Sequence, residues 1–524
     1  MRSITRPVPT SVAGECAVPE ALLCVDSSRA LLAVCAIAAA TAALHLAVAG
    51  RYDAFRNELY FIICGRHPDF GYADQPPLVP LIAAATQTFG VDVWLLRLPA
   101  VLAATALVPL SAAFARVAGG GGLSMVLAAA AAALSPALAG LTSTLTTATL
   151  EPLAWTACAF FIARAVLLDD RRALLWAGLI FGIAMEAKYG ILMWMIPLFA
   201  GLLLTSARKV LAWREFWLGA ALAGAVAAPS LVWQAIHGWP FLAVVSRHSP
   251  NDLTGGPAAF AMQQIFASNP ALAPLWLAGV VGPFVSPALK PLRFLAIAFI
   301  GAAALDFATH GKDYYLFAAY PTMFAVGAVA CADLGRRVAT TWLLASAVVF
   351  AIFAPVALPV LDPPTLAAYL RVTHLRPPPD EIAAIGAPLT QVFSDEMGWR
   401  ALEKQVARVY RALPDTERRQ TAILASNYGE AAAIDFYGRM DGLPPALSGE
   451  NQYFLWGAHG YDGAVIIHTN GEARRWQRYC DRLQVVGTFG APYAMPYEND
   501  RPILLCHGLR ANLTQTWYRF KSFR

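Results

Sequence analysis

Long apolar stretches separated by short polar segments dominate residues 30–361 of the chain. A helix needs about 20 mostly apolar residues to cross the hydrocarbon core of a bilayer. About eleven segments approach or meet this length, and we expect each of them to form a membrane-spanning helix. These segments are residues 30–49, 97–116, 123–141, 148–168, 173–187, 190–206, 215–235, 270–288, 293–309, 315–332 and 341–361.

Residues 51–96 form a long connection between the first two of these segments. Within the connection, residues 78–89 are mostly apolar, but this stretch of 12 residues is too short to span a bilayer. We expect it to form an interfacial or re-entrant helix, so that the connection is partly embedded in the membrane.

The pattern changes after residue 361. Residues 395–413 have the spacing of an amphipathic helix, and residues 430–437 indicate a second, short helix. Residues 421–426 and 464–468 are short apolar runs typical of buried strands. Residues 380–524 are therefore predicted to form a small mixed α/β domain.

Composition separates the same two regions. Hydrophobic residues make up 58% of the chain and charged residues 14%, against about 45–50% and about 25% in soluble domains. Charged residues account for 38 of the 361 residues in 1–361 (about 11%) and for 35 of the 163 residues in 362–524 (about 21%). We therefore expect a membrane domain over residues 30–361 and a soluble domain over residues 362–524. The net charge of +5 comes from scattered basic residues, which gives nucleic-acid binding little support.

The distribution of basic residues predicts an orientation. If residues 1–29 are a cytoplasmic segment and the eleven spans alternate, cytoplasmic segments hold 14 of the 21 Lys and Arg residues before residue 362 and outer segments hold 7. This asymmetry follows the positive-inside rule. It places residues 51–96 and the soluble domain outside, in an oxidising compartment that permits a disulfide between Cys480 and Cys506, the only cysteines of the soluble domain.

Ionisable residues near a membrane are costly and therefore mark functional sites by default. Most of those near the membrane core gather on the expected outer side, which indicates a site that opens to that face. They are Glu58, Asp74, Glu151, Glu186, Lys188, His237, Lys312 and Asp313.

Several short motifs surround these residues. They are Arg56-Asn57-Glu58-Leu59-Tyr60-Phe61, Gly71-Tyr72-Ala73-Asp74-Gln75-Pro76-Pro77-Leu78, Leu150-Glu151-Pro152-Leu153 with Trp155, Glu186-Ala187-Lys188-Tyr189, Trp233-Gln234 with His237-Gly238-Trp239, and Gly311-Lys312-Asp313-Tyr314-Tyr315 followed by Ala319-Tyr320-Pro321. In this order, over roughly residues 30–340, the chain resembles the membrane glycosyltransferases of the GT-C fold. Within that fold it is similar to the PMT-like family 39 group, which includes protein O-mannosyltransferases and the lipid A aminoarabinose transferases.

The resemblance implies transfer of a sugar from a polyprenyl-phosphate donor to a lipid, polysaccharide or protein acceptor. It also implies a bacterial inner membrane enzyme of cell-envelope biogenesis that acts on the periplasmic face. An acceptor hydroxyl needs a carboxylate base within hydrogen-bond reach, for which the candidates are Glu58, Asp74 and Glu151. A phosphate leaving group needs cations and donors. The residues expected to supply them are Lys188, Tyr189, His237, Arg247 and Lys312.

The chain departs from the family pattern at Asn57. The family has an Asp-Glu pair after the first span, and its Asp is the proposed base, whereas Asn57 cannot accept a proton at neutral pH. Either Glu58, Asp74 or Glu151 serves as the base, or the protein is an inactive relative with a binding or assembly role. A lipid or solute transporter is a further alternative, although the sequence shows none of the internal repeats that transporters often have.

Each candidate also has a structural alternative. Glu58 could pair with Arg56, Asp74 could fix a turn before Pro76, and Glu151 could stabilise a helix start. Lys188 could pair with Glu186, and Lys312 could extend to the membrane interface. No motif has the spacing of a metal site, so no metal or other cofactor is expected, although a divalent cation bound by residues distant in sequence stays open.

Overall fold

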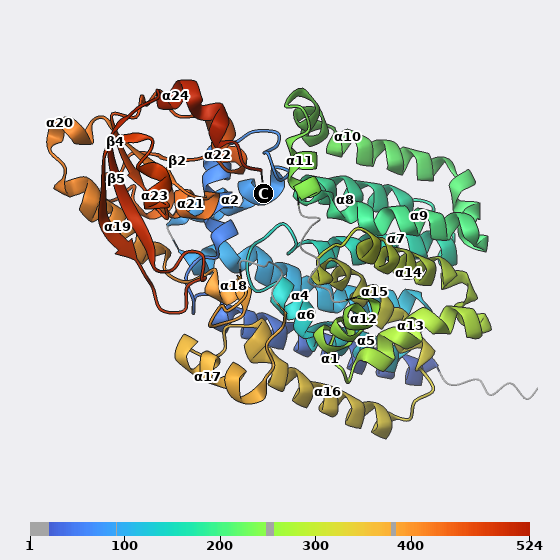
Figure 1. Cartoon of the computed structure of the whole chain (residues 1–524). Coiled ribbons are helices and arrows are strands. Elements are labelled where there is room, and N and C mark those ends of the chain that lie inside the picture. Colours follow the sequence, from blue (N-terminus) through green and yellow to red (C-terminus); the bar gives the residue numbers. More distant parts are fainter. Residues whose placement is uncertain (1–19, 91, 248–255, 379–383, 524) are drawn as a thin grey trace, which may run out of the picture.

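The computed structural model describes residues 20–90, 92–247, 256–378 and 384–523 of the chain. Figure 1 shows two parts: a bundle of roughly parallel helices and, at one end of the bundle, a smaller part that contains a sheet. The expected segment 1–29 falls largely on residues outside the described ranges.

Six helices of the described chain are long and apolar enough to cross a membrane. They are α1 (Glu20–Val48), α4 (Val93–Val117), α7 (Glu151–Leu168), α10 (Arg214–Ile236), α14 (Arg293–Ala308) with the preceding turn η4 (Pro287–Leu292), and α16 (Arg336–Ala357). A seventh span is broken: η2 (Tyr189–Ile191) and α9 (Leu192–Leu204) meet η3 (Ser206–Ala212) at an angle of 105°.

Four shorter apolar helices complete the set that the sequence predicts. They are α5 (Gly122–Ala133), α8 (Ala173–Ala187), α13 (Ala273–Val285), and the stretch 314–330, which contains most of η5 (Asp313–Ala319) and α15 (Tyr320–Ala330). Each of the eleven predicted segments thus coincides with an apolar helix. The predicted segment 123–141 is interrupted, because Ser135 is extended and Pro136 starts a new short helix, α6 (Pro136–Leu141).

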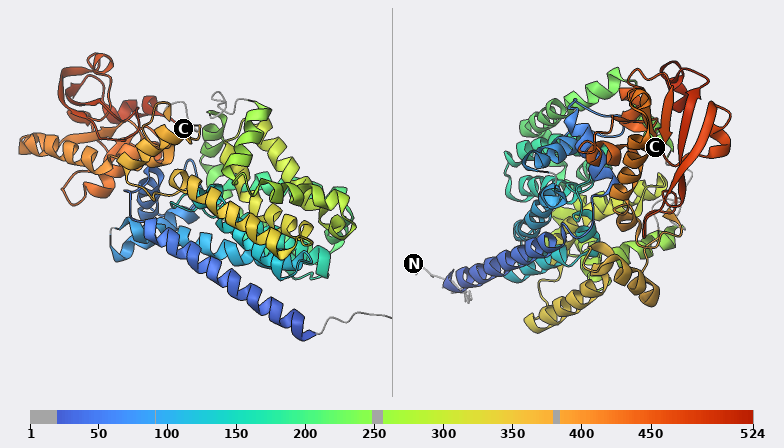
Figure 2. Two further views of the ribbon diagram at one scale, coloured as in Figure 1. Left: turned by 90° about the horizontal axis from the view of Figure 1, so that it is seen from below. Right: turned by 90° about the vertical axis from the view of Figure 1, so that its left-hand side faces the viewer.

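The surface of the bundle carries many exposed apolar side chains. Trp217, Leu344 and Val348 are all more than half exposed, which a water-facing helix surface would not tolerate in such number. Figure 2 shows α1 along one edge of the bundle, and few of its residues between Ser28 and Val48 are buried inside the protein. The fold is therefore that of a multi-pass membrane protein.

Short helices connect the spans at the end that faces the sheet. They are α2 (Arg56–Arg66), α3 (Leu78–Thr86), η1 (Gln87–Phe89), α11 (Pro240–Arg247), α12 (Pro257–Ala267) and α17 (Pro363–Thr373). Together, α3 and η1 cover residues 78–89, where the sequence predicts a short helix.

The smaller part contains a five-stranded sheet with the order β2-β1-β3-β5-β4. Its strands are β1 (Thr421–Ala425), β2 (Ala446–Ser448), β3 (Val465–His468), β4 (Cys480–Phe489) and β5 (Arg501–Leu509). Strands β1, β2 and β3 are parallel, whereas β5 runs antiparallel to both β3 and β4. The surrounding helices are α18 (Gln391–Ser394), α19 (Trp399–Ala412), α20 (Asp415–Arg418), α21 (Tyr428–Tyr437), α22 (Asn451–Trp456), α23 (Ala473–Trp476), α24 (Leu513–Thr516) and η7 (Trp517–Phe520).

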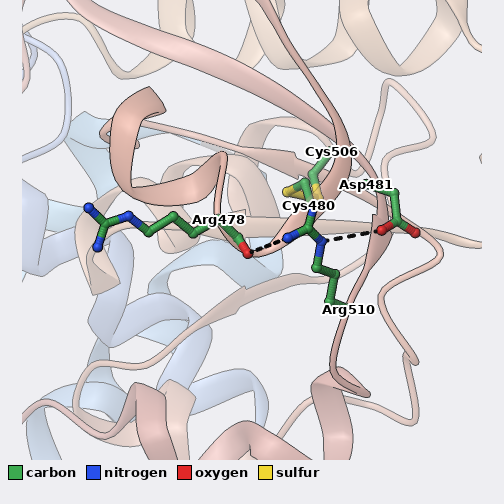
Figure 3. The surroundings of a disulfide bond; sticks show 5 residues. All are labelled: Arg478, Cys480, Asp481, Cys506 and Arg510. Atoms are coloured by element: carbon green, nitrogen blue, oxygen red, sulfur yellow. Dashed lines mark hydrogen bonds and ion pairs between the residues drawn. A yellow bond between two sulfur atoms is a disulfide. The ribbon is translucent and has the colours of Figure 1, made fainter.

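A disulfide joins Cys480 at the start of β4 to Cys506 in β5 (Figure 3). Next to it, the Arg510 guanidinium donates to the carbonyl oxygen of Arg478 at 3.2 Å and to the Asp481 carboxylate at 3.4 Å. The disulfide therefore pins the edge strand of the sheet to its neighbour.

Helix α2 lies between the two parts. Its residues Leu59–Cys64 are buried in one apolar cluster that also contains Ile434 of α21 and Ile467 of β3. The same cluster includes Leu145 and Ala187 from the membrane bundle. The first connection of the chain is thus held on one side by the bundle and on the other by the sheet domain.

Candidate active site

The Glu58 carboxylate, in the first turn of α2, is fully buried and accepts four hydrogen bonds. Arg97 of α4 donates to Oε1 from Nε at 3.1 Å and to Oε2 from Nη2 at 3.0 Å. The backbone N–H of Leu145 donates to Oε1 and that of Phe55 to Oε2, both at 2.8 Å. With these partners in place, Glu58 has little capacity left to accept a proton from a substrate, and its contacts favour a structural role.

Arg97 also reaches the sheet domain. Its Nη2 donates to Glu396 Oε2 at 2.9 Å, and its two Nη atoms donate to the backbone carbonyl oxygens of Ala49 and Asp53, each at 3.0 Å. Burial raises the pKa of Glu396 to about 8, against the opposing effect of Arg97. Arg97 therefore connects two buried carboxyl groups, one from each part of the protein, and loss of any one partner would leave a buried group without its counterpart.

Replacing Glu58 with alanine is expected to lower the free energy of unfolding by about 3–5 kcal/mol, because Arg97 and two backbone N–H groups lose a buried partner. Thermal unfolding of the purified protein, followed by tryptophan fluorescence, measures this. The matched control is Asp170→Ala, which removes a partly exposed ion pair with Arg164 and should cost at most about 1 kcal/mol. If Glu58→Ala melts like the wild type yet lacks activity, Glu58 acts chemically, as the sequence predicts.

Asp74 lies in the loop that connects α2 to α3. Its Oδ1 accepts a hydrogen bond from the Tyr60 hydroxyl at 2.7 Å, and its Oδ2 accepts one from Asn451 Nδ2 of the sheet domain at 3.3 Å. Burial raises the pKa of Asp74 to about 6, against the opposing effect of these two hydrogen bonds. A carboxylate with this pKa is ionised at neutral pH and basic enough to take a proton from a bound hydroxyl.

The end of α10 supports this loop. The Trp233 ring packs so closely on Gly71 that a Cβ at position 71 would lie 2.9 Å from it. Gln234 Nε2 donates to the carbonyl oxygen of Tyr72 at 2.8 Å. His237 stacks on Trp233 with 3.9 Å between ring centroids, and its Nδ1 lies 2.8 Å from the Trp233 carbonyl oxygen. His237 itself is exposed, beside the loop rather than on Asp74.

Two further predicted residues, Glu151 and Lys188, form an ion pair. Glu151 is the first residue of α7 and Lys188 follows α8, with 2.7 Å between Lys188 Nζ and Glu151 Oε2. The ammonium group also lies 4.8 Å from the ring centroid of Tyr315 and 5.5 Å from that of Tyr314, both in η5. The side chain of Lys188 stays 19% exposed, so the ammonium is held firmly but is not sealed off.

A small cavity adjoins this pair. It has a volume of about 10 Å³ and is lined by Glu151, Lys188 and Trp155 among others, which is enough room for about one water molecule. The indole N–H of Trp155 is buried and has no hydrogen-bond partner among the residues that the structure describes. The cavity is therefore lined by a cation, a carboxylate and an indole.

A chain of contacts links the Lys188 pair to Asp74. Tyr189, next to Lys188, packs edge-on against Phe241 with 4.8 Å between ring centroids. The backbone N–H of Phe241 donates to Gln234 Oε1 at 3.1 Å, and Gln234 in turn binds the Tyr72 carbonyl. Two carboxylates and a lysine from three separate segments are thus linked by contacts at the end of the bundle that faces the sheet domain.

The remaining predicted residues are placed less directly. Lys312 is the residue before η5, the element that carries the two tyrosines beside Lys188. Arg247 ends α11, and its side chain lies outside the described part of the chain. Asn57 accepts a hydrogen bond from the Tyr428 hydroxyl of α21 at 2.8 Å. Over the described residues, no three His, Cys, Asp or Glu side chains are grouped to hold a metal ion.

Sequence reasoning missed the contribution of the sheet domain. Asn451, Gln452 and Tyr428 contact residues of the first connection of the membrane domain, and Glu396 binds Arg97 of α4. The available sequence signal was the polar run Gly449–Gln452. The structure buries Glu450, Asn451 and Gln452 of this run.

Comparisons with known proteins bear on the fold and on part of the sequence. Residues 74–233, which include Asp74, Glu151 and Lys188, match the sequence model named dolichyl-phosphate-mannose-protein mannosyltransferase. No curated protein sequence matches the chain at a significant level. The crystal structure of ArnT from Cupriavidus metallidurans in the apo state is similar, with a TM-score of 0.58 and 14% identity over 93% of this chain and 98% of that chain. The structure of the same protein bound to undecaprenyl phosphate gives a TM-score of 0.57 with the same identity and coverage.

Proposed function

We propose that this chain, a membrane protein with the GT-C glycosyltransferase fold, transfers a sugar from a polyprenyl-phosphate donor to an acceptor hydroxyl. The fold and the match of residues 74–233 to the mannosyltransferase model support a glycosyltransferase. The crystal structure of ArnT with undecaprenyl phosphate supports a polyprenyl-phosphate donor, because this chain shares that protein's fold over nearly its whole length.

The observation that carries the proposal is the Lys188–Glu151 pair beside two tyrosine rings. A lysine close to the membrane core costs free energy, and such residues usually have a function. Phosphate is an anion that a lysine recognises. The bundle carries exposed apolar side chains that a lipid tail can contact. We infer that Lys188 binds the donor phosphate, and we expect further contacts from Tyr189, His237, Arg247 and Lys312, the other donors and cations that the sequence predicts.

The proposed reaction is a direct displacement at the anomeric carbon. Asp74 takes the proton of the acceptor hydroxyl as its oxygen forms the new bond to the anomeric carbon. The bond from that carbon to the phosphate oxygen breaks, and both of its electrons stay with the phosphate. Lys188 stabilises the charge that develops there, and the displacement inverts the anomeric centre. Glu151 holds Lys188 in place, and Glu58 holds α2, which carries Tyr60.

The proposed location is the periplasmic face of a bacterial inner membrane, with the sheet domain outside and the start of the chain in the cytoplasm. Two observations support it. Basic residues concentrate on the segments assigned to the cytoplasm, and the sheet domain carries a disulfide, which forms and persists in oxidising compartments.

The test uses the purified full chain with undecaprenyl-phosphate carrying radiolabelled sugars and a membrane extract as the source of acceptor. The expected result is label in one macromolecular or lipid fraction, with none for heat-treated protein. Separation of the fraction into lipid, polysaccharide and protein then identifies the acceptor class. Absence of transfer from every polyprenyl-phosphate sugar, with a folded protein, would contradict the proposal.

The asparagine at position 57 supports one alternative. In this alternative the protein is an inactive relative that binds its ligands without turnover. Replacing Asn57 with Asp separates the two. If Asp74 is the base, the transfer rate should change by less than about tenfold, because the Tyr428 hydroxyl can still donate to the new carboxylate. A tenfold change corresponds to about 1.4 kcal/mol in the activation free energy. Transfer by the variant together with none by the natural chain would establish the inactive relative.

A further inference from the structure

A short segment of the sheet domain, residues 449–452, lies directly on the loop that carries Asp74. Asn451 Nδ2 lies 3.3 Å from Asp74 Oδ2, and the backbone N–H of Gln452 donates to the Tyr60 hydroxyl oxygen at 3.1 Å. The backbone N–H of Ala73 donates back to Gln452 Oε1 at 3.0 Å. One segment therefore contacts Asp74, its hydrogen-bond donor Tyr60 and its chain neighbour Ala73.

Asn451 has an unusual backbone conformation for this role. Its φ is +47°, in the left-handed region that residues other than glycine rarely adopt, and its side chain is almost fully buried. Such a conformation is costly, and it persists only where the surrounding structure fixes it. Here it turns the amide of Asn451 toward Asp74.

The surroundings that fix this conformation come from the last described residues. Asn451 N–H donates to the Ser522 carbonyl oxygen at 3.1 Å, and Ser522 N–H donates to the Gly449 carbonyl oxygen at 2.8 Å. At Gly449, a Cβ would lie only 2.0 Å from the Phe520 carbonyl oxygen. Phe523 packs in one small apolar cluster with Ala73, next to Asp74.

We propose that Asn451 is a positioning residue for Asp74, so that the soluble domain completes the catalytic site of the membrane domain. The Tyr60 hydroxyl and the Asn451 amide each bind one oxygen of the same carboxylate, and together they fix its plane. Each oxygen keeps a further lone-pair site in a fixed orientation, at which the acceptor hydroxyl can donate its proton. This inference rests on the proposed function, in which Asp74 is the base.

The same contacts set the ionisation of Asp74. The ionisable groups that face it are the Tyr60 hydroxyl and the Cys64 thiol of α2, while residues 449–452 contribute amides and the Glu450 carboxylate binds the Tyr428 N–H instead. The amide of Asn451 stabilises the charged form and so lowers the pKa of Asp74. Loss of the amide should therefore raise the pH at which Asp74 becomes a base.

The test is the variant Asn451→Gly, because glycine adopts a φ of +47° without strain and only the amide is lost. The acidic limb of the transfer rate lies near pH 6 in the wild type and is expected to move up by about one pH unit in the variant. At high pH the rate of the variant should lie within a few fold of the wild-type rate. Asn451→Asp should move the limb further, because it adds a negative charge beside Asp74. The matched control is His459→Gly, which also replaces a positive-φ residue of this domain, but one that is exposed.

The outcomes separate the inference from the proposed function. An unshifted pH profile in Asn451→Gly, with Asp74→Asn inactive, overturns the positioning role and leaves the base in place. Full activity of Asp74→Asn overturns the proposed base and the inference with it. A rate lowered equally at every pH in Asn451→Gly assigns Asn451 a structural role only and also overturns the inference.

Discussion

Replacing Lys188 with glutamine is expected to lower the rate of sugar transfer by about 10²–10³-fold, the usual cost of removing one donor from a developing oxyanion. The reason is the position of the ammonium group, which Glu151 and two tyrosine rings hold at the end of the bundle. The measurement is the initial rate of transfer from labelled undecaprenyl-phosphate sugar at saturating acceptor.

A binding measurement accompanies the kinetic one. Undecaprenyl phosphate should raise the melting temperature of the wild-type protein, because a ligand that binds only the folded state stabilises it. The shift should shrink in Lys188→Gln. An unchanged shift and an unchanged rate would remove Lys188 from the phosphate site.

Lys209 provides the matched control. It also pairs with a carboxylate, Asp169, at 3.0 Å and lies 6.0 Å from the ring of Trp213, but both partners of the pair are well exposed. Lys209→Gln should therefore alter the rate by no more than about twofold, since exposed pairs contribute little. An equal loss in both variants would indicate a general effect of charge rather than a site.

Replacing Asp74 with asparagine is expected to lower the transfer rate by about 10²–10⁴-fold, the typical contribution of a general base. The variant keeps the size of the side chain and can still accept a hydrogen bond from Tyr60, so the protein should stay folded. The pH dependence of the wild type adds a second test. The pKa of Asp74 is raised to about 6 by burial, so the rate should rise with pH through about 6 and level off above it.

Asp435 provides the control for this prediction. It is also a buried carboxylate whose pKa is raised to about 6, and it accepts a hydrogen bond from the Tyr453 hydroxyl at 2.7 Å. It lies in α21, and its second oxygen accepts a hydrogen bond from the backbone N–H of Ala446. Asp435→Asn should leave the pH profile unchanged, and a shifted acidic limb in this variant would show that the limb does not report Asp74.

The membrane part of the fold could be predicted from sequence because apolar length is a strong signal. Each predicted span coincides with a helix, and the errors lie at breaks, such as the one at Ser135 and Pro136 and the bend before η3. In the sheet domain the buried strands β1 and β3 were found. Strands β2, β4 and β5 were not predicted. The residues of β4 between Cys480 and Phe489 are largely exposed and show no regular alternation.

The candidate site could be predicted only where ionisable residues lie near the membrane, because such residues cost free energy there and are therefore rare. Asp74, Glu151 and Lys188 stand out in an apolar chain, and the structure pairs Lys188 with Glu151 rather than with Glu186, the partner that the sequence suggested. The contacts of Glu58 could not be foreseen, because three of its four donor groups come from Arg97 and Leu145, distant in sequence. The role of Asn451 was equally hidden, since 377 residues separate it from Asp74.

Arg97 has a consequence for the order in which the protein assembles. Glu58 is 39 residues from Arg97 and is available as soon as the first two spans have entered the membrane, whereas Glu396 is 299 residues away. The ribosome delivers Glu396 only after the remaining spans have been synthesised. Docking of the sheet domain onto the bundle is therefore the last step that completes the hydrogen-bond partners of the Arg97 guanidinium. Biogenesis of the two parts is thus coupled through a single side chain.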